Sequence, residues 1–566
     1  MRKSKVILSV IFITILHISQ FSGSLTSIYI NGKIFNGLTD ELNEALVIRN
    51  GRILFVGTTA KALRFNSKKQ RKIIDLNGKS IIPGFHDADL NFPLGAGLLG
   101  NSIDFHDLDQ DSILHRLKAK KKNLVAKDPI YGYNFEHLLW KDRRWPNKYD
   151  LDKVSNNLPI IIFSSDGNTA WVNSTVLKEC GIEKNSPEIQ GGRIVRFEDN
   201  EPTGILCGNS IELLKRFNFE NAVQNIKLDK KKILKAIKYA NSLGLTSVTT
   251  LGDLKFVKFL EELESVGKLN LRFNIILPSK NIGRYLIKKV AFNSGTSFVR
   301  VISISKNIDG NLYTSDAAMF SPYPDRSYYG FIRSNKNDLS DLVSLYKQNG
   351  IIGSFYAEGD RAVHIVLKAI KAASRRNQVN LSRSRISNFT FVIDDDISLL
   401  KLMSVIPVMR PGSFITEVES IERIVGQRKA GNALRAGTLK SMGVQVAFGS
   451  GWPGDSLNPL KGIKFSVFRN VSKGNRNGWF VEEKLSMREA IKAYTYTPSF
   501  SVSNENRTGT IEKGKLADII ILNGDIFSEN LSPETFSSET KVVETIIGGK
   551  TVFRKEETKV KRREPS

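Results

Sequence analysis

A recurring unit in the middle of this 566-residue chain constrains its fold more than any other feature. The unit is an amphipathic helix that ends near a glycine and is followed directly by a short apolar strand. It occurs over Lys231–Thr249, Leu339–Tyr356 and Ala433–Phe448, with Gly244, Gly350 and Gly443 at the junctions. Helices that end at glycine and lead straight into apolar strands are typical of βα units and a parallel sheet.

Two more apolar runs, Leu158–Phe163 and Val405–Met409, fit the same scheme. Many such units over about 400 residues favour a closed barrel over an open sheet. We therefore predict an α/β fold with a TIM-like (β/α)8 barrel.

Both ends of the chain are rich in short strands. In the N-terminal part, Asn31-Gly32 and Asn50-Gly51 lie between extended apolar runs, and Lys72–Ile82 predicts another strand pair around Asn77-Gly78. Asn-Gly between such runs is the strongest short signal for a hairpin. In the C-terminal part, Ala517–Leu522 predicts a strand and Val542–Val552 a hairpin through Gly548-Gly549. We predict a small β-sandwich built from both ends.

The first 24 residues resemble a targeting segment. Arg2, Lys3 and Lys5 precede the apolar run Val6–Ile18, and small residues follow at Ser22–Ser24. This pattern predicts a secretory signal peptide. The run is shorter than the roughly 20 residues of a membrane span, and an uncleaved N-terminal anchor stays open. We expect a secreted or luminal protein, in which Cys180 and Cys207 could form at most one disulfide.

The chain is strongly basic, with 83 Lys and Arg against 57 Asp and Glu and a formal net charge of +26. The basic residues are spread widely and accompany no helix-turn-helix, zinc-finger or aromatic RNA-binding pattern. We interpret them mainly as a solvated surface and expect no nucleic acid partner. Weak binding to anionic surfaces stays open.

The most informative motif is the segment Ile81–Asn91, which reads Ile-Ile-Pro-Gly-Phe-His-Asp-Ala-Asp-Leu-Asn. Further motifs follow in order along the chain: Ser165–Ser174, Glu201–Gly204, Asp309-Gly310 with Ala317-Ala318 and Tyr323, Gly359–Ala362, Ala447–Ser450 with Trp452-Pro453 and Asn458–Leu460, and Gly514–Asp518. Together these motifs resemble the amidohydrolase superfamily, its amidohydrolase 3 branch in particular, over almost the whole mature chain. The resemblance implies a metal-dependent hydrolase of non-peptide C–N bonds, with zinc or another divalent metal at the barrel mouth.

The resemblance also shows where metal ligands and the general base would stand. Each of those positions carries a residue that departs from the family pattern: Asp89, Asn91, Ser305, Tyr356, Asn388 and Gly451. Gly451 takes the place of an Asp that usually serves as ligand and base. Asn168 replaces a histidine that the resemblance assigns to substrate contact, and Glu358 and Asp360 are further candidates for substrate binding.

The number and spacing of the histidines also argue against a zinc site, independently of the family resemblance. The chain has six, at positions 17, 86, 106, 115, 137 and 364, and none forms His-x-His or Glu-x-x-His. A zinc site of ordinary ligand spacing is therefore not visible. We expect no resident cofactor, and we expect His86 to pack or to donate a hydrogen bond.

Two routes to a working site stay open. Asp87, Asp89 and Asn91 could form an oxygen-ligated site for Ca²⁺, Mg²⁺ or Mn²⁺, and Glu358 or Asp360 could join them across the mouth. Alternatively, Tyr356, Glu358 and Asp89 could act as acid and base without metal.

The main hypothesis is an inactive member of the family, a pseudoenzyme whose barrel mouth binds a small molecule or a protein partner. The alternative is a divergent hydrolase of C–N bonds with a rebuilt site. Whether the chain is an enzyme is thus left undecided by its sequence. The expected organisation is a signal peptide or anchor at 1–24, the first part of the sandwich at 25–82, the barrel with insertions at 83–507, the second part of the sandwich at 508–556, and a basic tail at 557–566.

Overall fold

The fold is seen in a computed structural model. It describes residues 26–65, 71–99, 103–105, 108–122, 129–135, 137, 140, 144–164, 169–189, 192–217, 229–312, 315–324, 327–333, 336–377, 383–470 and 478–556. The expected signal segment at 1–24 and the basic tail at 557–566 lie outside these residues, as does Asn168.

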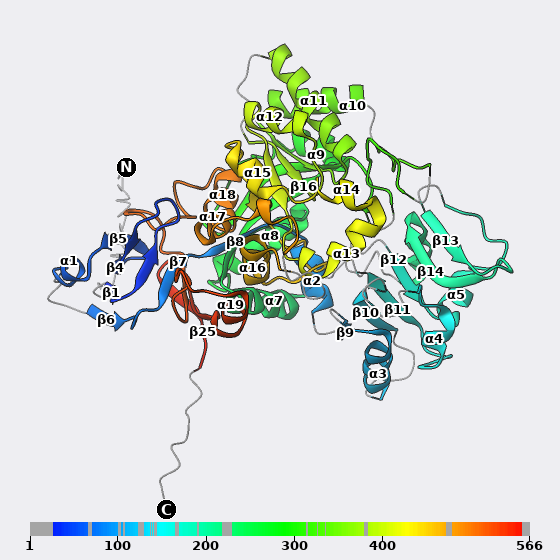
Figure 1. Ribbon diagram of the computed structural model, residues 1–566, viewed down its shortest axis with the longest axis horizontal. Helices are drawn as coiled ribbons and strands as arrows, with labels where there is room; N and C mark the ends of the chain where they lie inside the picture. The colour runs from blue at the N-terminus through cyan, green and yellow to red at the C-terminus, as the bar shows by residue number, and fades with distance from the viewer. Residues whose placement is uncertain are drawn as a thin grey trace, which may run out of the picture.

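Parallel strands form a nearly closed barrel at the centre of the molecule (Figure 1). In spatial order they are β8 (Phe85–Leu90), β15 (Leu245–Leu251), β16 (Arg272–Pro278), β18 (Val299–Asn307), β19 (Ile352–Tyr356), β20 (Arg385–Ser387), β21 (Ile406–Met409) and β22 (Ala447–Phe448), and β17 (Ser294–Gly295) pairs with β18 at the side. A hydrogen bond from the Gly451 backbone N–H to the Asp89 carbonyl, 2.8 Å long, joins the last strand end to the first. This arrangement confirms the predicted TIM-like barrel.

Helices alternate with these strands and cover the barrel from outside (Figure 1). They are α7 (Lys230–Ser242), α8 (Leu254–Ser265), α9 (Ile282–Ile287), α10 (Lys336–Gln348), α11 (Asp360–Asn377), α12 (Asp394–Leu402), α13 (Phe414–Val425), α14 (Gln427–Ala430), α15 (Ala436–Ser441), α16 (Pro459–Phe468), α17 (Met487–Ala493) and α18 (Tyr496–Ser501). Gly244, Gly350 and Gly443 have φ of 85°, 64° and 79° and turn the chain from helix to strand. The three predicted helix–glycine–strand units are all present, although the last strand is only two residues long.

An insertion carries a second sheet, which Figure 1 places on the side of the barrel away from the terminal strands. Its strands are β9 (Ile103–Asp104), β10 (Ile130–Phe135), β11 (Ile160–Ser164), β12 (Thr169–Val172), β13 (Gly192–Arg196) and β14 (Pro202–Gly208), with α3 (Gln110–Lys121), α4 (Lys148–Asp152), α5 (Ser174–Cys180) and the 3-10 helix η2 (Asn209–Phe217) around them. The expectation that Leu158–Phe163 is a barrel strand is wrong, because this run forms β11 here and pairs with β10 and β12. An apolar run indicates that a strand is buried, but it does not indicate which sheet the strand belongs to.

The two ends of the chain form two further sheets that pack on each other. One sheet contains β5 (Arg52–Gly57), β4 (Ala45–Arg49), β1 (Thr26–Ile30) and β6 (Arg71–Asp75); the other contains β25 (Lys550–Arg554), β24 (Val542–Ile547), β23 (Ile519–Leu522), β7 (Ser80–Pro83), β2 (Lys33–Phe35) and β3 (Leu42–Asn43). Tyr29 and Leu46 from the first sheet share a buried cluster with Ile81 and Ile519 from the second. The predicted sandwich from both chain ends is confirmed.

The turns of the sandwich correct two hairpin predictions. The turns at Asn50-Gly51 and Gly548-Gly549 do close hairpins, β4–β5 and β24–β25. Asn31-Gly32 and Asn77-Gly78 instead carry the chain from one sheet to the other, so the strands that flank them are not paired. Asn31 and Asn77 have φ of 53° and 49°. The sequence shows the need for a left-handed turn residue, but not whether the turn stays within one sheet.

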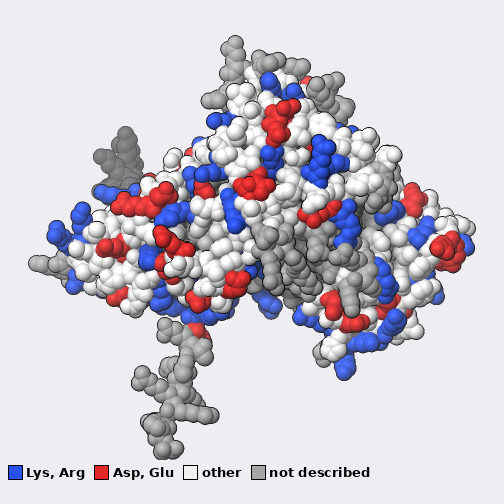
Figure 2. Space-filling view, viewed as in Figure 1, with Lys and Arg blue, Asp and Glu red and all other residues white. Residues whose placement is uncertain are grey.

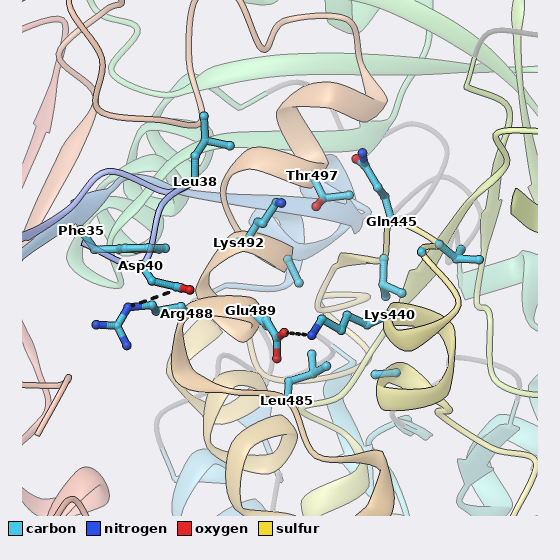
Figure 3. Close-up of a pocket in the computed structure, with 15 residues that line it drawn as sticks. Phe35, Leu38, Asp40, Lys440, Gln445, Leu485, Arg488, Glu489, Lys492 and Thr497 are labelled. Atoms are coloured by element: carbon cyan, nitrogen blue, oxygen red, sulfur yellow. Dashed lines mark ion pairs between the residues drawn. The ribbon is translucent and has the colours of Figure 1, made fainter. Parts of the chain in front are cut away.

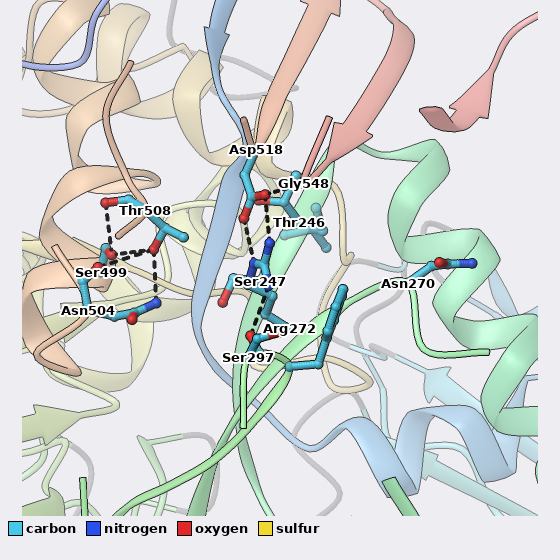
Figure 4. Close-up of polar contacts among 12 residues, drawn as sticks. Thr246, Ser247, Asn270, Arg272, Ser297, Ser499, Asn504, Thr508, Asp518 and Gly548 are labelled. Atoms are coloured by element: carbon cyan, nitrogen blue, oxygen red, sulfur yellow. Dashed lines mark hydrogen bonds and ion pairs between the residues drawn. The ribbon is translucent and has the colours of Figure 1, made fainter. Parts of the chain in front are cut away.

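A buried ion pair joins the barrel to the sandwich (Figure 4). The Arg272 guanidinium on β16 donates to both oxygens of Asp518, with Nε–Oδ2 at 2.6 Å and Nη2–Oδ1 at 2.9 Å. Asp518 Oδ1 also accepts from the Gly548 backbone N–H at 2.8 Å. The last residue of the Gly514–Asp518 motif is thus a structural link.

Charges of both signs are interspersed on the face that Figure 2 shows. Among the described residues, no helix is long and apolar enough to cross a membrane.

Candidate functional site

The centre of the barrel mouth is the carboxylate of Asp89, near the end of β8. Its side chain is 2% exposed. Oδ1 accepts a hydrogen bond from the Tyr356 hydroxyl at 2.7 Å, and Oδ2 accepts from Nη2 of Arg410 at 2.9 Å. Tyr356 ends β19 and Arg410 directly follows β21, so three strand ends converge on this carboxylate. Burial, and then the Asp89 charge, raise the pKa of Tyr356 well above its ordinary value, which keeps its hydroxyl a donor.

Gly451 makes room for the arginine. Its φ is 70°, and a Cβ at this position would lie 2.5 Å from Cζ of Arg410. That separation is far below a van der Waals contact, so Arg410 occupies space that any side chain at 451 would need. The residue that replaces the family's expected Asp therefore admits a cation beside Asp89.

A second guanidinium lies deeper in the barrel. Arg385, the first residue of β20, is fully buried and donates through Nη2 to the Ala88 carbonyl. Its Nε and Nη1 have no hydrogen-bond partner among the described residues. Burial lowers the pKa of Arg385, and the Asp89 carboxylate opposes that effect.

Asp87 supports the backbone under the mouth. Its Oδ1 accepts from the backbone N–H groups of Asp89, at 3.1 Å, and Ser450, at 3.0 Å. Oδ2 is buried without a partner among the described residues. Burial raises the pKa of Asp87 to about 7, so the neutral acid is strongly populated at neutral pH.

The side chain of Asn91 is used for a helix cap. Its Oδ1 accepts from the Leu94 backbone N–H at 3.3 Å, at the start of α2 (Phe92–Leu98). The side-chain oxygens of the three residues thus have different roles. Asp87 supports the backbone, Asp89 binds Tyr356 and Arg410, and Asn91 caps a helix. Among the described residues, no group of three or more His, Cys, Asp and Glu side chains is arranged to hold a metal ion.

The remaining predicted positions are scattered around the mouth. Ser305 Oγ lies 3.4 Å from the Leu277 carbonyl, and Asn388 has φ of 56° with Oδ1 buried and without a partner among the described residues. Glu358 Oε2 accepts from the Leu312 backbone N–H at 2.9 Å, and Asp360 Oδ1 from that of Phe320 at 2.8 Å. The two acidic residues therefore hold the loop that follows β18.

His86 behaves as a hydrogen-bonding residue of the interior. Its Nε2 lies 2.8 Å from the Thr249 hydroxyl on β15. Burial lowers the pKa of His86 to about 3, and the neighbouring charges of Arg385 and Arg300 act in the same direction.

The structure thus brings Asp89 and Tyr356 into contact and adds two arginines that the sequence interpretation did not single out. The signal that could have identified them is an Arg inside or directly after an apolar strand, as in Arg385-Ile386 and Val408-Met409-Arg410. Long charged side chains are seldom fully buried unless they are paired, so such a position calls for an acidic partner.

The barrel, the terminal sandwich and the order of motifs agree with comparisons to known proteins. A profile of the amidohydrolase family matches residues 72–553. The chain is 25% identical to Protein LONG AFTER FAR-RED 3 of Arabidopsis thaliana over 92% of this chain and 91% of that protein. It is also 25% identical to the putative amidohydrolase YtcJ of Bacillus subtilis strain 168, over 94% of this chain and 100% of that protein.

A solved structure has the same fold. The crystal structure of an uncharacterized metal-dependent hydrolase from Pyrococcus furiosus superposes with a TM-score of 0.69 and 24% identity. The match covers 88% of this chain and 99% of that one. On the family match over most of its length, the chain belongs to the amidohydrolase family.

Proposed function

We propose that this protein is a member of the amidohydrolase family that no longer carries out metal-dependent hydrolysis, and that its barrel mouth binds a small molecule or a protein partner. The observation that supports this most is the pairing of Asp89 with Arg410 and Tyr356. The guanidinium of Arg410 lies against Asp89, a residue at one of the positions where the resemblance calls for a metal ligand.

The residues at the mouth do not fit a catalytic dication. A metal requires ligand atoms with free lone pairs and an uncompensated negative charge around them. Both Asp89 oxygens already accept hydrogen bonds. Nη2 of Arg410 lies 2.9 Å from Asp89 Oδ2, and its positive charge would repel a dication bound there. Gly451 offers no ligand atom. The Asp87 carboxyl is held by two backbone N–H groups, and burial favours its protonated form.

The alternative, a rebuilt hydrolase site, has less support. A general base needs a free lone pair within reach of substrate. Each Asp89 oxygen already accepts one hydrogen bond, and the Arg410 charge lowers the basicity of this carboxylate. Glu358 holds a loop through the Leu312 N–H and also accepts from the Thr390 hydroxyl. Both carboxylates are thus engaged in contacts within the protein, which favours a structural role over that of a general base.

Metal analysis combined with an activity assay tests the proposal. The purified full chain is treated with chelator, incubated with Zn²⁺ or Mn²⁺, desalted and analysed for bound metal. We expect far less than one metal per chain and no turnover of N-formyl or N-acyl amides above the buffer rate. A metal-dependent member of the family, treated in parallel, is the positive control.

Two outcomes would contradict the proposal. Stoichiometric metal whose removal abolishes turnover would restore the ordinary family mechanism. Metal-independent turnover that disappears in Asp89→Ala, while the melting temperature is retained, would support the rebuilt site.

A further inference from the structure

A cavity of about 350 Å³ lies away from the mouth, where the sandwich meets the barrel helices (Figure 3). It is lined by the end of β2 and the chain after it, by α15 and the residues that lead into β22, and by the segment from Leu485 through α17 into α18. The residues between α15 and β22 lead into the N-terminal end of β22, so the cavity lies at the N-terminal ends of the barrel strands. The mouth lies at their C-terminal ends. Its volume falls within the range of small-molecule sites.

The floor of the cavity is apolar. Buried side chains from all three parts of the chain form it: Phe35, Ala436, Val444, Val446, Leu485 and Ala493. Leu38, 41% exposed, stands at the edge. Such a floor favours the apolar body of a ligand, at roughly 25 cal/mol for each Å² removed from water.

Of the described basic residues at the rim, two have a carboxylate partner and one does not. Lys440 pairs with Glu489, and Nε of Arg488 lies 3.9 Å from Oδ1 of Asp40 (Figure 3). Lys492 has no carboxylate within ion-pair distance among the described residues. Its Nζ lies 5.3 Å from the centre of the Tyr496 ring.

A hydroxyl that lines the cavity lies next to this cation. Thr497 is 3% exposed and lines the cavity, and its hydroxyl makes no hydrogen bond to a described residue. Figure 3 shows the Thr497 hydroxyl and the Lys492 amino group turned toward each other across one side of the cavity. A hydroxyl that lines the cavity can donate a hydrogen bond to a polar ligand atom at this place.

We propose that this cavity binds a small monocarboxylate with an apolar body. The ammonium of Lys492 and the hydroxyl of Thr497 donate hydrogen bonds to the carboxylate, and the apolar part packs on Phe35, Val446 and Leu485. Among the described residues that line the cavity, Lys492 is the one cation without a carboxylate partner, which matches an anion of one charge. This site is independent of the mouth and of the function proposed for it.

Octanoate is a suitable probe, titrated into the full chain at low salt by isothermal calorimetry. We expect saturable binding that is about ten-fold weaker in Lys492→Met, because a charge-assisted hydrogen bond is lost, and several-fold weaker in Thr497→Val. Lys492→Arg should retain most of the affinity. Lys484→Met, at an exposed lysine outside the cavity, is the matched control and should bind as the native chain does.

The melting temperature of each variant shows that it is folded. Octan-1-ol, which has the same apolar chain and no charge, should bind at least ten-fold more weakly than octanoate. Equal affinity for octanol and octanoate would overturn the proposal, and so would octanoate binding that Lys492→Met leaves unchanged, since the anion would then bind elsewhere.

Discussion

At the scale of single residues, the mouth is shaped by Gly451 and by the arginine side chain that lies against it. Gly451 has no side chain, and Arg410 occupies the space that a Cβ there would need. The positive charge beside Asp89 is the guanidinium of Arg410, which is bonded to this carboxylate. This pairing requires no bound ion to neutralise the buried carboxylate.

Replacement of Arg410 should therefore destabilise the fold. In Arg410→Met the Asp89 carboxylate, 2% exposed, would retain only the Tyr356 hydroxyl. Loss of one partner of a buried ion pair typically costs about 3 kcal/mol in the free energy of unfolding. Urea denaturation measures this loss, and the double variant Asp89→Asn with Arg410→Met should recover much of it.

Arg193→Met is the control for the loss of an arginine as such. Arg193 is exposed on β13, and its replacement should change the free energy of unfolding by no more than about 0.5 kcal/mol. Equal stability of Arg410→Met and Arg193→Met would show that the pair at the mouth contributes nothing.

At the scale of the element, strand β8 explains why its polar residues are so closely bonded. All six residues of Phe85–Leu90 are buried. A buried polar group without a partner is costly, so His86, Asp87 and Asp89 each bond to a neighbouring strand or strand end. Through Asp87 and Ser450, this motif ties the first and last strands of the barrel together.

The buried His86 should make stability depend on pH. Its pKa is about 3 in the folded chain, against an ordinary value of 6.5, so the unfolded chain binds more protons between these values. The free energy of unfolding therefore falls as pH drops through this window, by about 2 kcal/mol between pH 7 and pH 5. In His86→Gln this contribution is absent, because glutamine does not titrate.

Denaturation curves of the native chain and of His86→Gln at several pH values give the measurement. The carboxylates titrate in both proteins, so the difference between the two stabilities isolates His86. That difference should shift by about 2 kcal/mol between pH 7 and pH 5, in favour of the variant at the lower pH. Parallel curves would mean that His86 is accessible to protons in the folded state.

At the scale of the whole molecule, the two chain ends depend on the barrel and on each other. Strand β23 from the C-terminal end lies between β7 and β24, so one sheet contains strands from both ends. Arg272 and Asp518 then attach this sheet to the barrel, with side chains 6% and 3% exposed (Figure 4). The pair is bidentate and buried, so it links the sandwich to the barrel at a defined point.

Asp518→Asn should lower the free energy of unfolding by about 3 kcal/mol, since Arg272 would remain buried with a neutral partner. Asp394→Asn is a matched control, because Asp394 pairs with Arg435 but its side chain is 83% exposed. The control should cost no more than about 1 kcal/mol. Thermal and urea unfolding of both variants measure the difference, and similar losses would contradict the structural role of the Arg272–Asp518 pair.

The sequence by itself determined the barrel, the sandwich from both chain ends and the family. Helix periodicity, the glycines at 244, 350 and 443, and the order of the motifs are local properties that a single chain displays. The residues at the expected ligand positions could also be read from it directly, including Gly451.

Only the tertiary structure decided which strands share a sheet and what fills the mouth. The run Leu158–Phe163 joined the inserted sheet, and Asn31-Gly32 and Asn77-Gly78 led between sheets, because neither choice depends on the local sequence. Arg410 lies 321 positions after Asp89, yet its guanidinium bonds to that carboxylate. Contacts over such separations arise where strand ends converge, and no spacing in the sequence records them.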